Sequence, residues 1–188
     1  MSLTAASLIA QLISFVVLIT TSVLVVGPWM NRKPLAVALA VPLWIHVFRY
    51  VALQIFSAQR SGFAVSDALA SEIAWGDVAA TVLAAAGLWL LHYRSPVVRL
   101  IMWALVVESV IDLANATIGG VRENALDSAS GVTWLILNLY VPSLWVTAGL
   151  MAWQLLARRG EELTADAGSA RSLVESSEMA PRSSVRPV

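Results

Sequence analysis

The chain contains no cysteine, and only 13% of its 188 residues are charged. The lack of cysteine excludes disulfides, thiolate metal sites, iron–sulfur clusters and cysteine nucleophiles, so any chemistry must use carboxylate, imidazole, guanidinium or hydroxyl groups. Basic and acidic residues number 12 each, and the formal net charge is +0. Because no basic excess is available to neutralise a phosphate backbone, the composition argues against nucleic acid as a partner.

Apolar residues make up 59% of the chain, and its mean hydropathy is +0.77, well outside the range of soluble globular proteins. A helix needs about 20 mostly apolar residues to cross a bilayer. Five segments meet this condition, at 5–27, 35–57, 73–92, 97–118 and 132–157. The sequence therefore predicts an all-α, integral membrane bundle of five transmembrane helices over residues 1–159, with the lipid bilayer as its surroundings.

Helix-breaking residues indicate where these spans end. Gly27 and Pro28 are expected to close the first span, and Gly119 with Gly120 the fourth. Beyond Arg159 the chain is rich in Ser, Glu, Arg and Pro, with too little apolar content to order itself. Residues 160–188 are therefore predicted to form a disordered cytoplasmic tail.

Basic residues gather at alternate ends of the predicted spans. The connections after spans one, three and five carry Arg32, Lys33, Arg94, Arg99, Arg158 and Arg159. The other loops, 58–72 and 120–131, hold only Arg60 and Arg122 beside four acidic residues. Since Lys and Arg near helix ends stay cytoplasmic, we expect the N-terminus outside and the C-terminus inside. A bacterial cytoplasmic (inner) membrane is the expected location.

The most informative feature is a set of ionisable residues inside these spans, namely His46, Arg49, Asp77, Glu108 and Asp112. Such residues are costly in a bilayer and usually serve a function. His46 and Glu108 fall near mid-span, while Arg49 and Asp112 lie three and four residues nearer the outer surface. At about 1.5 Å of rise per residue, the two pairs match in depth. The sequence predicts that they meet.

Helical spacing extends this set. Asn115 shares a stripe with Glu108 and Asp112, and Tyr50 shares a face with His46 and Arg49. We expect an outward-opening polar pocket walled by spans two to four, and lined from span five beside a bend at Pro142. The candidate ligand-binding or proton-binding residues are His46, Arg49, Tyr50, Asp77, Glu108, Asp112, Asn115, Asn138 and Tyr140.

Charge pairing follows from the same residues. Arg49 should stay charged and pair with Asp112 or Asp77. Glu108 should be protonated or hydrogen-bonded to a charged His46, which makes those two the candidate titrating pair. The alternative is structural, because polar side chains also hold membrane helices together.

Three functions fit these residues. The first is binding or transport of a small molecule or a proton-coupled solute in the outward pocket. The second is an isomerase-like membrane enzyme with His46 and Glu108 as acid and base on a lipid-like substrate, so catalysis stays open. The third is an accessory or assembly subunit, whose polar stripe contacts a membrane-protein partner or a second copy of the chain.

No cofactor is expected. A haem held by two histidines needs both at similar depth, and His92 lies near the inner surface whereas His46 is at mid-span. Retinal needs a lysine within a span, and Lys33, the single lysine, lies in a loop. A metal on His46, Glu108 and Asp112 is geometrically possible, but membrane carboxylates bind protons at least as readily, so no metal site is predicted.

Overall fold

The computed structural model describes residues 1–161 and 163. Most of the predicted tail, residues 160–188, therefore lies outside the described residues. Within them the chain forms helices and turns without any strand. Five helical spans are long and apolar enough to cross a membrane, which confirms the all-α prediction and indicates an integral membrane location.

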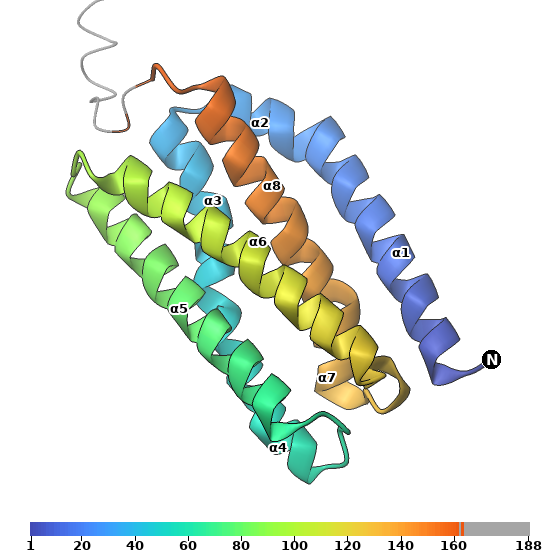
Figure 1. Ribbon diagram of the computed structural model, residues 1–188. Helices are drawn as coiled ribbons and strands as arrows, with labels where there is room; N and C mark the ends of the chain where they lie inside the picture. The colour runs from blue at the N-terminus through green and yellow to red at the C-terminus, as the bar shows by residue number, and fades with distance from the viewer. Residues whose placement is uncertain (162, 164–188) are drawn as a thin grey trace, which may run out of the picture.

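The spans follow one another in a simple up-and-down order (Figure 1). The first contains α1 (Leu3–Thr21), a π-helical turn (Ser22–Val26) and α2 (Gly27–Asn31). The second contains α3 (Leu35–Val47), a 3₁₀ segment (Phe48–Gln54) and α4 (Ile55–Arg60). The third and fourth are α5 (Asp67–His92) and α6 (Val98–Arg122), followed by a short 3₁₀ turn (Ala125–Asp127). The fifth contains α7 (Gly131–Leu135), a π-helical turn (Ile136–Tyr140) and α8 (Val141–Ala157).

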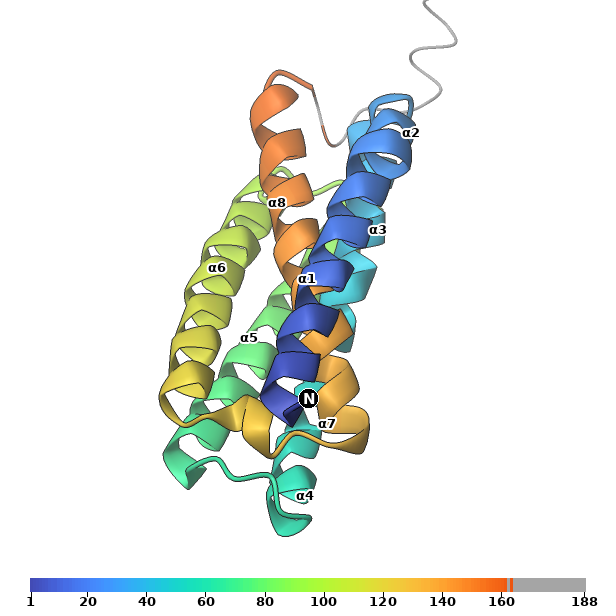
Figure 2. The ribbon, with the colours of Figure 1, turned by 90° about the vertical axis from the view of Figure 1, so that its right-hand side faces the viewer.

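The two ends of the bundle differ in charge. We call the end with connections 32–34, 93–97 and 158–161 the basic end, and the end with connections 61–66 and 123–130 the acidic end. α1 lies at the edge of the bundle, nearest the viewer in Figure 2, with α5 on the far side. Its span has the fewest buried residues, whereas α3, α5, α6 and α8 surround the interior.

Gly27 and Pro28 do not end the first span, so that prediction is wrong. A proline ring clashes with the carbonyl four residues earlier in a regular helix. Here a wider π-helical turn comes directly before the proline, and the Gly27 N–H donates to the Ser22 carbonyl instead. The same solution precedes Pro142, where the Val141 N–H donates to the Ile136 carbonyl. Each proline therefore stays inside a continuous span.

Gly119 and Gly120 do not end α6 either, because the helix continues to Arg122. A Cβ atom at Gly119 would overlap the Leu69 side chain of α5, with Cδ2 at 3.3 Å and Cδ1 closer still. The glycine thus serves close packing between α5 and α6 rather than termination.

The apolar interior is divided into two clusters, one toward each end. Toward the basic end, α3, α5, α6 and α8 contribute Leu35, Leu39, Leu43, Ala80, Ala84, Met102, Leu105, Met151 and Leu155. Toward the acidic end the cluster is smaller and consists of Ile55, Phe63, Ala70, Ala74, Ala125 and Ala129. The ionisable residues of the spans lie between these two clusters.

Arg158 ties the spans together at the basic end. Its guanidinium donates to the carbonyls of Met30 and Lys33, at 3.2 and 2.9 Å, and pairs with Glu161 at 2.6 Å. Glu161 in turn accepts the Leu35 N–H at 2.8 Å, which caps the start of α3. The end of the first span, the start of the second and the end of the fifth are thereby joined.

Glu123 performs a similar task at the acidic end. α5 begins six residues earlier than the predicted residue 73, because Ser66 caps it by accepting the Leu69 N–H at 3.2 Å. The Glu123 carboxylate accepts both the Ser66 N–H and the Ser66 hydroxyl, each at 2.6 Å. The hydroxyl bond and then the backbone bond lower the pKa of Glu123.

This lowered pKa predicts a pH dependence of stability. The stabilisation is complete above the pKa of an unfolded glutamate, about 4.3, and is lost as pH falls through the lower folded value. We expect the melting temperature of the purified protein to drop more between pH 6 and pH 3 in wild type than in Glu123→Gln. Glu72→Gln, at an exposed carboxylate of α5, is the control and should behave as wild type. Equal pH profiles for wild type and Glu123→Gln would contradict the assignment.

Candidate functional site

Arg49 is at the centre of the polar interior. α3 ends at Val47, and the 3₁₀ segment that follows carries Arg49 inward between α5 and α6. The side chain has 0% exposure, although it is the largest fully buried side chain described. A 3₁₀ segment in the middle of a span often marks a functional position.

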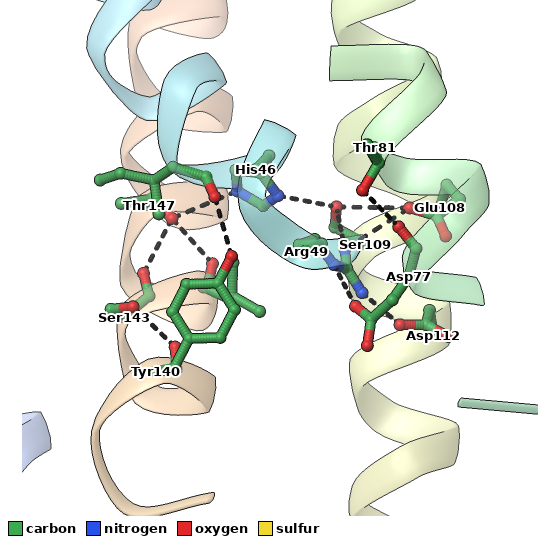
Figure 3. Close-up of polar contacts among 12 residues, drawn as sticks. His46, Arg49, Asp77, Thr81, Glu108, Ser109, Asp112, Tyr140, Ser143 and Thr147 are labelled. Atoms are coloured by element: carbon green, nitrogen blue, oxygen red, sulfur yellow. Dashed lines mark hydrogen bonds and ion pairs between the residues drawn. The ribbon is translucent and has the colours of Figure 1, made fainter. Parts of the chain in front are cut away.

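Every guanidinium nitrogen of Arg49 has a partner (Figure 3). Nε donates to Oδ1 of Asp77 at 2.5 Å, and Nη2 donates to Oδ2 of Asp112. Nη1 donates to the Ser109 hydroxyl at 2.9 Å and lies 3.6 Å from Oε2 of Glu108. The sequence offered Asp77 or Asp112 as the partner, and the structure brings Arg49 together with both.

The charges of this cluster do not balance if every group ionises. One guanidinium faces three carboxyl groups, those of Asp77, Glu108 and Asp112. Buried charges are tolerated only when they are paired and hydrogen-bonded. The planar fork of arginine can satisfy several acceptors at once, which a lysine ammonium cannot do in the same geometry. The remaining negative charge must be balanced by protons or by a cation from outside the cluster.

His46 extends this network to α8. Its Nδ1 is 3.4 Å from the Ser109 hydroxyl and its Nε2 is 3.2 Å from the Thr147 hydroxyl. Thr147 donates its own hydrogen to the Ser143 carbonyl at 2.8 Å, so it accepts from His46. Nε2 then carries the imidazole hydrogen, a tautomer assigned from the bonding pattern. The chain of contacts runs from Asp77 and Asp112 through Arg49, Ser109 and His46 to the fifth span.

Of the two alternatives for Glu108, protonation or a hydrogen bond to His46, the direct hydrogen bond is not formed among the described residues. Ser109 lies between them, with its hydroxyl oxygen 3.4 Å from both His46 Nδ1 and Glu108 Oε2. The reason is the position of the buried face of α6, which passes through Leu105, Ser109 and Leu113 and leaves Glu108 at its edge.

Two further predicted site residues lie outside the cluster. Tyr50 is 47% exposed and packs near Phe48, with ring centroids 6.2 Å apart. The 3₁₀ segment turns by about 120° per residue, so Tyr50 rotates away from the face that His46 and Arg49 share. Asn115 is exposed because it shares the stripe of Glu108 at the edge of α6 rather than its buried face.

Of the two site residues predicted from the fifth span, Tyr140 lines the cavity next to the cluster and Asn138 does not. The Tyr140 hydroxyl donates to the Ile45 carbonyl at 2.9 Å, close to the point where α3 changes to the 3₁₀ segment. Asn138 is buried but donates to the Trp134 carbonyl of its own helix at 2.7 Å. Within the π-helical turn, the Leu137 carbonyl instead accepts from Gln11 of α1 at 3.1 Å.

A cavity of 180 Å³ extends from the carboxylates toward the acidic end. All five spans contribute to its mostly apolar wall, with Leu8, Gln11, Gln54, Ile73, Leu137 and Tyr140 among the lining residues. Asp77 and Asp112 also line it. Arg49 occupies one oxygen of each carboxylate, and within the described residues the second oxygen has no hydrogen-bond donor. The site therefore combines an apolar chamber with two carboxylates in its wall.

Sequence reasoning missed Ser109 and Thr147. Both are small hydroxyl residues that cost little in a membrane helix, so their presence gives no signal of the kind that Arg49 gives. Ser109 could have been found from its position, since it falls on the apolar stripe of Met102, Leu105, Val106 and Leu113 that faces the interior.

No group of three His, Asp or Glu side chains among the described residues is arranged to hold a metal ion.

Residues 6–156 match the model of a protein family described as a domain of unknown function, DUF8737. Neither the curated proteins nor the solved structures gave a match.

The close contact between α5 and α6 at this site gives a stability prediction. A Cβ atom at Gly76 would lie 2.6 Å from Cγ of Asp112 and still closer to its Oδ1. Gly76→Ala must therefore displace the carboxylate that holds Arg49, and should lower the free energy of unfolding by about 1 to 3 kcal/mol. Gly149→Ala is the matched control, because nothing lies within 4 Å of a Cβ atom there. Chemical denaturation in detergent measures both, and equal stabilities would show that the two helices are not in close contact at Gly76.

Removal of Arg49 gives a second prediction. Arg49→Gln leaves Asp77 and Asp112 buried without their cation and should cost about 3 to 5 kcal/mol of stability. The triple variant Arg49→Gln/Asp77→Asn/Asp112→Asn should recover a large part of this loss, since neutral amides need no counter-charge. The same denaturation assay checks it. A triple variant less stable than Arg49→Gln alone would mean that charge balance is not what the cluster provides.

Proposed function

The chain belongs to the DUF8737 family, and we propose that it is a membrane protein that binds a small, mainly apolar cation in the cavity that Asp77 and Asp112 line. The ligand and protons compete for the same carboxylates, so binding is proton-coupled. The location we propose is the bacterial cytoplasmic membrane, with the acidic end outside and both the basic end and the C-terminus inside. This orientation rests on the basic residues at alternate ends of the spans.

One observation carries the proposal, namely two carboxylates in the wall of an apolar cavity, each with one oxygen that Arg49 does not engage. Arg49 fixes both carboxylates but neutralises only one negative charge. An ammonium group on an apolar body would supply the missing positive charge and fill the apolar chamber. A neutral polar ligand would leave the charge of the cluster unchanged and therefore gains less.

The packing toward the basic end favours binding over an open channel. Between the carboxylates and the basic end, α3, α5, α6 and α8 form the larger apolar cluster, whose members include Leu39, Leu43 and Met102. Transport would require these helices to separate. The acid–base enzyme alternative requires His46 to face a substrate, whereas His46 is held between Ser109 and Thr147 and does not line the cavity.

A matched pair of probes tests the charge requirement. 2-Phenylethylamine and 2-phenylethanol have similar bodies, but only the amine is cationic at pH 7. We expect calorimetry on the purified protein to show amine binding that weakens from pH 8 to pH 5, as protons compete for the carboxylates. Asp112→Asn should weaken it roughly 10- to 100-fold, the loss of one hydrogen bond to a charged group. Glu72→Gln, outside the cavity, should bind as wild type does.

Equal binding of amine and alcohol, or equal effects of Asp112→Asn and Glu72→Gln, would reject the proposal. A stoichiometric protein partner in mild detergent, with neither probe bound, would support the accessory-subunit alternative instead.

The proposed orientation can be checked with single cysteines introduced into the wild-type chain, because this chain has no cysteine of its own. A membrane-impermeant maleimide should label Ser130→Cys in intact cells and Gly160→Cys only after permeabilisation.

A further inference from the structure

A second, larger hollow lies on the side of the bundle, between the first and fifth spans. It has a volume of 620 Å³ and a wall that is almost entirely apolar. Its lining includes Phe15, Ile19, Gly27, Trp145, Gly149 and Trp153. We call this hollow the α1–α8 groove. It is separate from the carboxylate cavity, with which it shares no lining residue.

Local sequence explains why the groove exists. Gly27 and Gly149 lie on opposite sides of it, and a Cβ atom at Gly149 would meet nothing within 4 Å. The π-helical turn that accommodates Pro28 forms part of the α1 side, since Ser22 and Val23 line it. The missing side chain of Gly149 and the widened turn therefore border the open space of the groove.

The length of the groove matches one leaflet of a bilayer. Its lining runs along the first span from Phe15 to Asn31, which are sixteen positions apart and therefore separated by about 24 Å of helix. One leaflet of a typical bilayer, with its headgroup region, is about 20 to 22 Å thick. The groove thus begins near mid-membrane and extends to the basic end, where a lipid headgroup would lie.

The end of the groove carries positive charge. Asn31 lines it, and the next residues, Arg32 and Lys33, are both exposed and form no ion pair with any residue that the structure describes. The guanidinium of Arg158 already donates to the carbonyls of Met30 and Lys33 and pairs with Glu161. The free positive charges near the groove are therefore those of Arg32 and Lys33. The side-chain Oδ1 of Asn31 accepts from Nε2 of Gln154 at 3.0 Å, so the side-chain amide hydrogens of Asn31 remain available to an acceptor.

We propose that the α1–α8 groove binds an anionic phospholipid. An acyl chain lies along the groove between Trp145 and Trp153, and the phosphate contacts Arg32, Lys33 and the Asn31 amide. A second copy of the chain is a poorer occupant. All copies share one orientation in a membrane, so the basic ends of two copies would meet at the same level and repel each other. The bilayer supplies the lipid, and the proposal is independent of the cation site.

Native mass spectrometry of the detergent-purified protein tests this proposal with phosphatidylglycerol and phosphatidylcholine of identical acyl chains. Wild type should retain phosphatidylglycerol preferentially. The double variant Arg32→Gln/Lys33→Gln should lose roughly 25-fold in affinity for it, about fivefold for each basic residue near an anionic group. Arg60→Gln/Arg122→Gln removes the same charge at the acidic end and should have no effect.

Gly149→Leu fills the groove without touching the basic residues, and should abolish retention of both lipids. Gly149→Ala, which leaves most of the space open, should retain them and shows that the position tolerates a side chain. Soluble glycerol phosphate should not compete, since it lacks the acyl chain. The proposal is overturned if both lipids bind equally to wild type, if Gly149→Leu retains them at an unchanged melting temperature, or if the two charge variants lose affinity equally. Isolation of a dimer that covers the groove would also overturn it.

Discussion

The buried guanidinium of Arg49 is the constraint on which the middle of this bundle depends. A cation in the interior of a membrane helix cannot be left without acceptors, because the surrounding hydrocarbon offers none. Asp77 on α5 and Asp112 on α6 therefore have to reach it from two sides, and Ser109 satisfies the remaining nitrogen. Three helices are fixed relative to one another by one side chain, and Gly76 provides the room for the close approach this requires.

Three spans contain irregular helical segments, and these orient side chains and accommodate prolines. The 3₁₀ segment points Arg49 inward and turns Tyr50 out. The two π-helical turns accommodate Pro28 and Pro142, and polar side chains reach the altered backbone nearby, as Gln11 does at Leu137. In a membrane such deviations are tolerated when the freed groups find partners inside the protein. Here one of them, Ser22–Val26, also forms part of the wall of the α1–α8 groove.

Some of this arrangement follows from the sequence, and some does not. Hydropathy predicts the five spans because the cost of exposing backbone to lipid leaves few alternatives. The meeting of Arg49 with Asp77 and Asp112 is predictable from depth, because charge in a bilayer demands a counter-charge. The exposure of Tyr50 is not predictable in this way, since it depends on the local change from an α-helix to a 3₁₀ segment. The role of Gly119 was missed because it is decided by Leu69, a residue fifty positions away in sequence. Placing the Ser109 hydroxyl in a membrane helix costs far less free energy than burying a charge, so its presence in the sequence does not point to the site.

The π-helical turn at Ile136–Tyr140 has a consequence for the whole fifth span. It holds one residue more than an α-helical turn, and each residue of a helix advances by about 100° around the axis. The extra residue therefore sets the rotational phase between the two halves of the span. With this phase, Thr133 before the bulge lines the cavity and contacts Gln54, while Thr147 after the bulge faces His46. Loss of a single residue from the bulge would keep the span helical but rotate one half out of step, and no adjustment of side chains could align both contacts again.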